Sequence, residues 1–292
     1  MTRPAAPRKG RVPDPAAMAG LLESAYTRWH RPEEIQRDPL RFPRRYPAVP
    51  DQEAAGFIAA AFAFGRVAAF LPVLEALFAR LGPTPAAFLA ALDPDGARMA
   101  AEGLGHRFAR PHHVAGLLLG TGAVLRQDGT LRGPVVRASR DGRGVTAGLR
   151  DLAVAVRAGS GPLDPGFLVP LEGRTGPLKR LHLFLRWMVR NDGIDLGAWP
   201  EIPAAALVFP MDVHVSRIAR LLGLIPDRTS GPSLGDALAL TTALRAFDPD
   251  DPVRFDFALS HLGISGKCSG KAGNACPDCP LAPVCSVRQG TP

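Results

Sequence analysis

Apolar residues recur every three or four positions along most of the chain, which is the spacing of one face of an α-helix. The clearest cases lie at 16–30, 51–64, 67–81, 85–92, 112–125, 149–156, 178–190 and 213–224. The strict alternation of apolar and polar residues that marks a half-buried strand is not convincing anywhere. The pattern therefore predicts an all-α fold.

Polar residues mark the starts of three of the predicted helices. Asp212 directly precedes the run VHVSRIARLLGL, where a carboxylate can accept the free N–H groups of the first turn. Ser233 and Asp236 have the Ser-x-x-Asp spacing of a capping box. Asp251-Pro252 is expected to open the last helix, because proline suits the first helical turn.

The composition narrows the class of protein. The chain has 292 residues and a 46% hydrophobic fraction, which excludes a disordered protein. The 31 glycines and 30 prolines follow no period, so collagen and repeat arrays are excluded. Glycine and proline punctuate the stretch 127–146, QDGTLRGPVVRASRDGRGVT, which is predicted to be a long, mobile loop.

The sequence favours a cytoplasmic protein without a membrane segment. No apolar run approaches the roughly 20 residues that a spanning helix needs. The first 15 residues, MTRPAAPRKGRVPDP, are basic and rich in proline, and they lack the apolar core of a secretory signal. We expect residues 1–15 to form a solvated, disordered tail.

The charge balance favours an acidic partner. Lys and Arg number 35 against 27 Asp and Glu, a net charge of +8, which is typical of nucleic-acid binding but also of a surface that only stays soluble. Only four of the cations are lysines, at positions 9, 179, 267 and 271. A lysine within the predicted fold, such as Lys179, therefore raises the question of why an amine is needed there.

Four cysteines lie within 18 residues near the end of the chain. Cys268, Cys276, Cys279 and Cys285 have the spacing C-x7-C-x2-C-x5-C. Disulfides fit poorly with a chain that we expect in the cytoplasm. Structural zinc sites usually show two CxxC pairs, whereas iron–sulfur loops have irregular spacings. We predict a structural [4Fe–4S] cluster, with zinc as the alternative.

A candidate for covalent chemistry lies in the helix predicted at 178–190. One face of this helix carries four basic residues, Lys179, His182, Arg186 and Arg190. A lysine among cations is favoured in its neutral, nucleophilic form, and such an amine forms Schiff bases with sugar aldehydes. Asp212 would stabilise positive charge at a sugar carbon or remove a proton, and Gly173 and Gly176 would let backbone amides approach a phosphate. The plainer interpretation is a surface lysine and a helix cap.

With these motifs the chain resembles the helix-hairpin-helix DNA glycosylase superfamily, the endonuclease III-like group. The cysteine segment resembles that group's iron–sulfur loop, with its first gap one residue longer. The segment FPMDVHVSRIARLLGL resembles the helix start that bears the catalytic aspartate, and the helix from Lys179 resembles the one that bears the catalytic lysine. The hairpin segment LEGRTGPLK is looser and longer than the usual L-P-G-V-G-x-K. FIAAAFAFGRV and LKRLHLFLRWMVR resemble, more narrowly, a bacterial branch known under a domain of unknown function.

The resemblance implies a two-lobed helical architecture with a central cleft and a C-terminal iron–sulfur loop. It divides the chain into a tail at 1–15, a helical segment at 16–52 that packs with the C-terminal lobe, a lobe with a degenerate hairpin at 53–208, a lobe with the aspartate at 209–267, and the cluster loop at 268–285.

The resemblance also implies a function in DNA repair. We expect a monomer that acts on double-stranded DNA, excises a damaged base, with an oxidised base favoured, and nicks the strand through a Schiff base on Lys179 while Asp212 stabilises the sugar cation. DNA contacts are expected from Arg66, Gly173, Gly176, Arg180, Arg186, Lys267 and Lys271. Two alternatives stay open: a glycosylase without lyase activity, and a non-enzymatic damage-binding protein that retains the fold and cluster.

Overall fold

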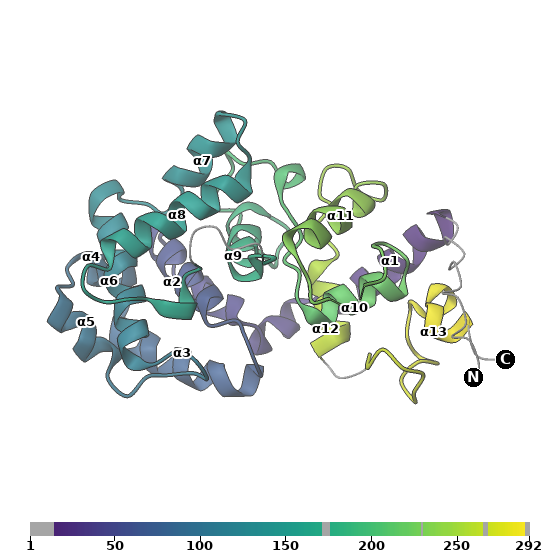
Figure 1. Ribbon diagram of the computed structural model, residues 1–292, viewed down its shortest axis with the longest axis horizontal. Helices are drawn as coiled ribbons and strands as arrows, with labels where there is room; N and C mark the ends of the chain where they lie inside the picture. The colour runs from purple at the N-terminus through teal and green to yellow at the C-terminus, as the bar shows by residue number, and fades with distance from the viewer. Residues whose placement is uncertain (1–14, 171–175, 229, 265–267, 290–292) are drawn as a thin grey trace, which may run out of the picture.

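The protein is all-helical in the computed structural model, which describes residues 15–170, 176–228, 230–264 and 268–289 (Figure 1). The α-helices of these residues are α1 (Pro15–Trp29), α2 (Val49–Ala61), α3 (Val67–Leu81), α4 (Pro85–Ala90), α5 (Pro94–Ala101), α6 (Pro111–Asp128), α7 (Gly133–Arg140), α8 (Val145–Gly159), α9 (Lys179–Val189), α10 (Val213–Leu221), α11 (Leu234–Leu244), α12 (Asp256–Ile264) and α13 (Ser286–Gln289). Extended pairing within this part of the chain is limited to one bridge, between His106 and Ala109. The predicted fold class is confirmed.

Proline sets the start of many helices. In α2, α4, α5, α6 and α7 a proline occupies the first turn. There its missing N–H removes no hydrogen bond, and its fixed φ suits a helix. The high proline content is therefore compatible with a helical protein. It also explains α5, which the apolar pattern did not predict: Pro94 opens this helix and Asp93 accepts the N–H of Gly96 as its cap.

The prediction of a long loop at 127–146 is wrong, because these residues include α7. Its glycines lie at helix ends: Gly129 ends α6 with φ +69°, and Gly144 precedes α8 with φ +81°. Between them Val135 and Ala138 are fully buried. Gly148 of α8 lies so close to α7 that an added Cβ would stand 2.5 Å from the Cα of Val135. The breakers thus separate three helices that pack tightly.

Two capping predictions are confirmed, and one helix start is wrong. Asp212 caps α10, and Ser233 forms a capping box at the start of α11 with Asp236. The last predicted helix begins at Asp256 rather than at Asp251-Pro252. Residues 251–255 form turns instead, and these let the side chain of Asp251 accept the Nε–H of Arg190 at 2.9 Å.

The helices gather in two groups, with α9 near the middle of the molecule. Helices α2 and α4 to α8 pack on one another on the left of Figure 1, while α1 and α10 pack against α12 on the right. Helix α9 contacts α2 and α8. The fully buried carboxylate of Glu53, on α2, accepts the Nε1–H of Trp199 at 2.8 Å and the N–H of Leu131 at 2.7 Å. Burial raises the pKa of this carboxyl group.

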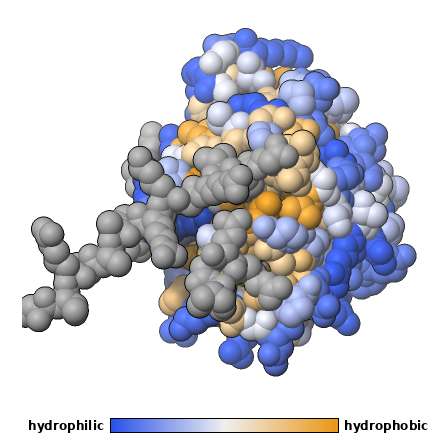
Figure 2. All heavy atoms as spheres, turned by 90° about the vertical axis from the view of Figure 1, so that its right-hand side faces the viewer, coloured by the Kyte–Doolittle hydropathy of each residue, from blue (hydrophilic) through white to orange (hydrophobic). Residues whose placement is uncertain are grey.

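Figure 2 shows the face to the right of Figure 1, with hydrophilic residues along its edge and hydrophobic residues toward its middle. None of the helices in the described ranges is both long and apolar enough to cross a bilayer.

Candidate active site

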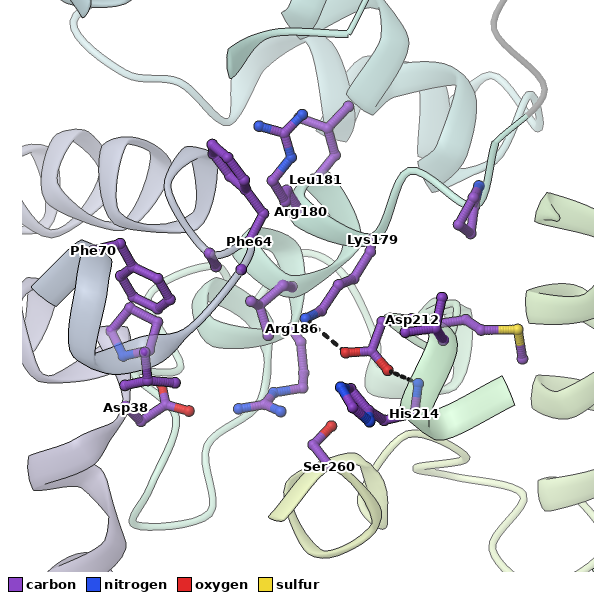
Figure 3. A pocket seen from close by; sticks show the side chains of 18 of the residues that line it. Asp38, Phe64, Phe70, Lys179, Arg180, Leu181, Arg186, Asp212, His214 and Ser260 are labelled. Atoms are coloured by element: carbon purple, nitrogen blue, oxygen red, sulfur yellow. Dashed lines mark hydrogen bonds and ion pairs between the residues drawn. The ribbon is translucent and has the colours of Figure 1, made fainter. Parts of the chain in front are cut away.

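The structure brings Lys179 and Asp212 together. Lys179 is the first residue of α9, and Asp212 directly precedes α10. The Lys179 Nζ donates a hydrogen bond to Asp212 Oδ2 at 3.0 Å, although the two residues lie 33 positions apart in the chain (Figure 3). The Lys179 side chain is 25% exposed and that of Asp212 is 17% exposed. A ligand can therefore reach both groups.

The two carboxylate oxygens of Asp212 have different partners. Oδ1 accepts the backbone N–H groups of His214 and Val215, each at 2.9 Å, and Oδ2 faces Lys179. Burial would raise the pKa of this carboxyl, but Lys179 and the Val215 amide outweigh burial and hold the pKa below its ordinary value. Asp212 is therefore an anion at neutral pH, held in place by the helix it caps.

The backbone turn that begins α9 is strained. Leu178 has φ +49°, in the left-handed region that residues with a bulky side chain avoid. The surrounding structure has to maintain such a conformation, which costs on the order of 1–3 kcal/mol. This turn sets the direction in which the Lys179 side chain projects from the start of α9.

Lys179 and Asp212 line a large cleft. Its volume is about 1880 Å³, and residues from both groups of helices form its walls. Figure 3 shows Phe64 and Phe70 on one side, Asp212 and His214 on the other, and Lys179 pointing between them. Aromatic walls beside an amine and a carboxylate suit a planar ring attached to a polar group.

Three exposed arginines at this cleft, Arg37, Arg66 and Arg107, have no carboxylate partner among the described residues. Of these, Arg66 was predicted to contact DNA, and its exposure agrees with that role. Gly176 also lines the cleft and is exposed. Lys271 is exposed on the cysteine loop, whereas Gly173 and Lys267 lie outside the described residues.

Two predicted phosphate-binding residues have structural partners instead. Arg186 is 2% exposed, and it donates to Asp195 at 3.0 Å and to Asp256. Its charge is thus already matched in the core, which does not favour the predicted DNA contact of Arg186. Arg180 donates to the main-chain oxygens of Ala61 and Phe167 and lies over the Phe64 ring, so most of its donors are occupied.

The electrostatic argument for Lys179 also changes. The sequence placed it among the cations Arg180, His182 and Arg186. In the structure Arg180 and Arg186 donate hydrogen bonds to partners of their own, and His182 is only 1% exposed. The charged group beside the amine is the carboxylate of Asp212. Lys179 therefore needs a proton acceptor before it can act as a nucleophile.

The buried partners of Arg186 were missed from the sequence, although one signal was available. Arg186 stands between Leu185 and Trp187 in a helix whose residues from Leu181 to Val189 are all buried. An arginine directly between two large apolar residues in a buried helix predicts an internal ion pair. The identity of Asp195 and Asp256 as partners could not be read from spacing.

The cysteine loop brings its thiols together by repeated turns. The N–H of Cys279 donates to the oxygen of Cys276, and the N–H of Ala282 donates to the oxygen of Cys279. Cys285 follows in the same way from Ala282. These turns keep Cys276, Cys279 and Cys285 within one short, tightly turned segment. The thiol of Cys279 is also within electrostatic range of Cys268, and burial raises its pKa.

The cysteine loop is hydrogen-bonded to two helices of the second group, α10 and α1. Arg217 of α10 donates to the carbonyl of Cys268 at 2.6 Å, and Arg28 of α1 donates to that of Asp278 at 2.8 Å. All four cysteines are partly buried. The donor set thus fits a group that takes four thiolates. In the described ranges no group of three Cys, His, Asp or Glu side chains is arranged to hold a metal ion.

Comparison with known proteins assigns this all-helical chain, which has Lys179 and Asp212 in its cleft, to a family. The family model described as "Protein of unknown function (DUF2400)" matches residues 38–265, and the chain belongs to that family. The matched range includes Lys179 and Asp212 and ends before Cys268. No curated protein and no solved structure matches the chain significantly.

Proposed function

We propose that this protein is a DNA glycosylase of the helix-hairpin-helix type that releases a damaged base and then nicks the strand. The observation that carries the proposal is the 3.0 Å contact between Lys179 Nζ and Asp212 Oδ2 at the wall of an open cleft. The cleft is large enough for a nucleoside that has left the duplex, as such chemistry requires. The unpaired guanidinium groups of Arg37, Arg66 and Arg107 at the same cleft suit phosphates.

The proposed reaction begins at the sugar carbon that holds the base. After Lys179 loses a proton, its nitrogen attacks this carbon, the bond to the base breaks, and a proton from the attacking amine leaves with the base. The lone pair of this nitrogen then breaks the bond between the carbon and the ring oxygen, the ring oxygen takes a proton from water, and a protonated Schiff base forms. Loss of a proton from the neighbouring carbon expels the 3′ phosphate, and water releases the sugar from the lysine.

Asp212 serves this reaction mainly as a fixed negative charge. Because its pKa is lowered, it is a weak proton acceptor but a good partner for the positive sugar that forms as the base departs. Its two amide hydrogen bonds hold it in place, so no reorganisation is needed at that step. Water that enters the open cleft can accept the proton of Lys179.

Borohydride trapping on a panel of lesion-containing duplexes tests the proposal. The wild-type protein should form a covalent complex with at least one substrate. Lys179→Gln should lower the yield at least about a thousandfold, or about 4 kcal/mol of transition-state stabilisation. Lys9→Gln is the matched control and should trap as the wild type does. Trapping that survives Lys179→Gln would assign the chemistry to another amine.

A second candidate is a glycosylase without lyase activity. The observation that favours it is the ion pair itself, since a lysine held by Asp212 can bind a phosphate as an ammonium ion. Base release without strand nicking, with Lys179→Gln weakening DNA binding only, would select this candidate. A non-enzymatic damage-binding protein predicts salt-dependent DNA binding with no base release on any lesion.

We further propose that Cys268, Cys276, Cys279 and Cys285 hold a [4Fe–4S] cluster, with zinc as the alternative. Four protein ligands leave no open position, so the group would stabilise the loop between Arg28 and Arg217 rather than take part in the reaction. Purified protein should be brown, with absorbance at roughly 400 nm, whereas zinc is spectroscopically silent. Cys279→Ser should lose the iron.

A further inference from the structure

An aromatic patch projects from the rim of the cleft. Phe108 is 61% exposed and Phe167 is 45% exposed, which is unusual for phenylalanine. Their rings meet edge to face with centroids 5.9 Å apart, and Phe167 meets Phe64 in the same way at 5.1 Å. Phe64 and Phe167 line the cleft that contains Lys179. These three rings, Phe64, Phe167 and Phe108, thus lead from the cleft wall to the solvent, and we call them the aromatic rim.

The outermost ring is held out by a strained turn. His106 and Ala109 exchange backbone hydrogen bonds of 3.0 and 2.9 Å, and Arg107 between them has φ +51°. Non-glycine residues rarely adopt this conformation, and they do so mainly where the surrounding structure and the function demand it. The ring nitrogen Nε2 of His106 also contacts the Phe64 oxygen at 2.7 Å, which ties the turn to the cleft wall. The fold therefore maintains strain to present Phe108 to solvent.

Cations surround the aromatic rim. The Arg107 guanidinium lies 5.1 Å from the Phe108 ring centroid, and that of Arg180 lies 4.3 Å from the Phe167 centroid. Arg107 and Arg66 are exposed, and neither has a carboxylate partner among the residues that the structure describes. Exposed apolar rings beside unpaired guanidinium groups suit a ligand that is both planar and anionic. A nucleobase on a phosphate backbone has that chemistry.

We propose that the aromatic rim stacks an unpaired nucleobase of DNA at the mouth of the cleft, with Arg107 and Arg66 binding the adjoining phosphates. The inference rests on the proposed function only in taking DNA as the ligand, and it names a site separate from Lys179 and Asp212. It implies that DNA with an unpaired base beside the reacting nucleotide binds better than a fully paired duplex. Because every base has an aromatic face, the site should tolerate any sequence.

Fluorescence anisotropy with the full-length protein tests the site. The probes are a single-stranded oligonucleotide of about 15 nucleotides and the fully paired duplex of the same sequence. Phe108→Ala should weaken single-strand binding about tenfold or more and duplex binding much less, since stacking is lost only with an unpaired base. Phe108→Trp should restore it. Leu238→Ala, on α11 and 46% exposed, is the matched control for the loss of an exposed apolar side chain and should change neither affinity.

The outcomes separate this site from the proposed chemistry. Lys179→Gln should abolish trapping and retain the Phe108-dependent preference for single strands. If the wild type releases no base but Phe108→Ala still weakens single-strand binding selectively, the glycosylase proposal fails and the stacking site stands. If Phe108→Ala and Phe167→Ala bind both probes as the wild type does, or lose affinity equally for both, the stacking site is overturned. Thermal unfolding of each variant checks the fold, which substitutions at exposed side chains should leave intact.

Discussion

The two ends of α9 carry the same kind of residue in very different surroundings. Lys179, at the start, is 25% exposed in an open cleft and has one carboxylate partner, Asp212. Arg186 and Arg190, toward the end, are each 2% exposed, and four aspartates surround them: Asp192, Asp195, Asp251 and Asp256. Helical periodicity places all three cations on one face. Their surroundings leave Lys179 accessible to a ligand, whereas Arg186 and Arg190 connect α9 to other segments through buried ion pairs.

The comparison shows why a basic helix face does not by itself indicate a DNA contact. Buried charges need partners in the protein, and α9 obtains them from the loop after it and from α12. The buried end thereby holds α9 and α12 together, while α12 also packs against α10, the helix that Asp212 caps. The buried end of α9 therefore helps to position Lys179 and Asp212 at the other end.

The largest effect on stability is expected at the buried end. Arg186→Met should lower the free energy of unfolding by about 3–5 kcal/mol, because it leaves Asp195 and Asp256 buried without this partner. Urea unfolding at pH 7 measures the change. Arg140→Met, at an exposed position on α7, is the control and should stay within about 0.5 kcal/mol. A stable Arg186→Met protein with weakened DNA binding would restore the DNA-contact interpretation.

A middle-sized effect is expected from His182, which lies between the two ends. Burial, with Arg150 adding to it, lowers the pKa of His182 to about 4. The unfolded chain takes up a proton near pH 6.5 and the folded protein near pH 4, so stability falls as the pH drops through this window. From pH 7 to pH 5 this residue should account for a loss of about 2 kcal/mol.

Urea unfolding at the two pH values, with His182→Gln and His112→Gln, checks this prediction. His182→Gln should flatten the pH dependence even if its stability at pH 7 is lower. His112 is exposed, so its replacement should leave the slope unchanged. Equal slopes for the wild type and both variants would contradict a neutral, buried His182.

Local sequence signals predicted the helices and the two groups of the candidate site, because those signals act within a few residues. Asp212 precedes an apolar helical run and caps α10, as expected. Ser233 stands three residues before Asp236 and caps α11, as expected. The loop prediction at 127–146 failed because glycine and proline mark helix ends as well as loops, and only the packing of Val135 and Gly148 shows which applies.

Long-range pairing was the part that the sequence left open. Lys179 and Asp212 were paired through the chemistry that an amine and a carboxylate can share and through a family resemblance, and no spacing rule places residues 33 apart at 3.0 Å. The partners of Arg186 and the aromatic contacts of Phe108 likewise depend on tertiary packing. Exposure decides between a core role and a ligand-binding role for each of these side chains, and exposure follows only from the complete fold.

The smallest effect on stability is expected at the open end, where Asp212 acts both as a helix cap and as an ionic partner. Asp212→Ala removes both roles and should cost about 1 kcal/mol, whereas Asp212→Asn keeps a capping oxygen and should cost about half of that. The ionic part should be present at neutral pH and vanish as the pH falls below about 4, because the folded-state pKa is lowered. Thermal unfolding measures the stability, and base release on the lesion panel measures the chemistry. The comparison of the two ends of α9 predicts that Asp212→Asn, though nearly as stable as the wild type, loses base release, since an amide has no charge to offer the sugar. An active Asp212→Asn variant would reduce Asp212 to a cap and leave the open end of α9 with no role in the reaction beyond binding.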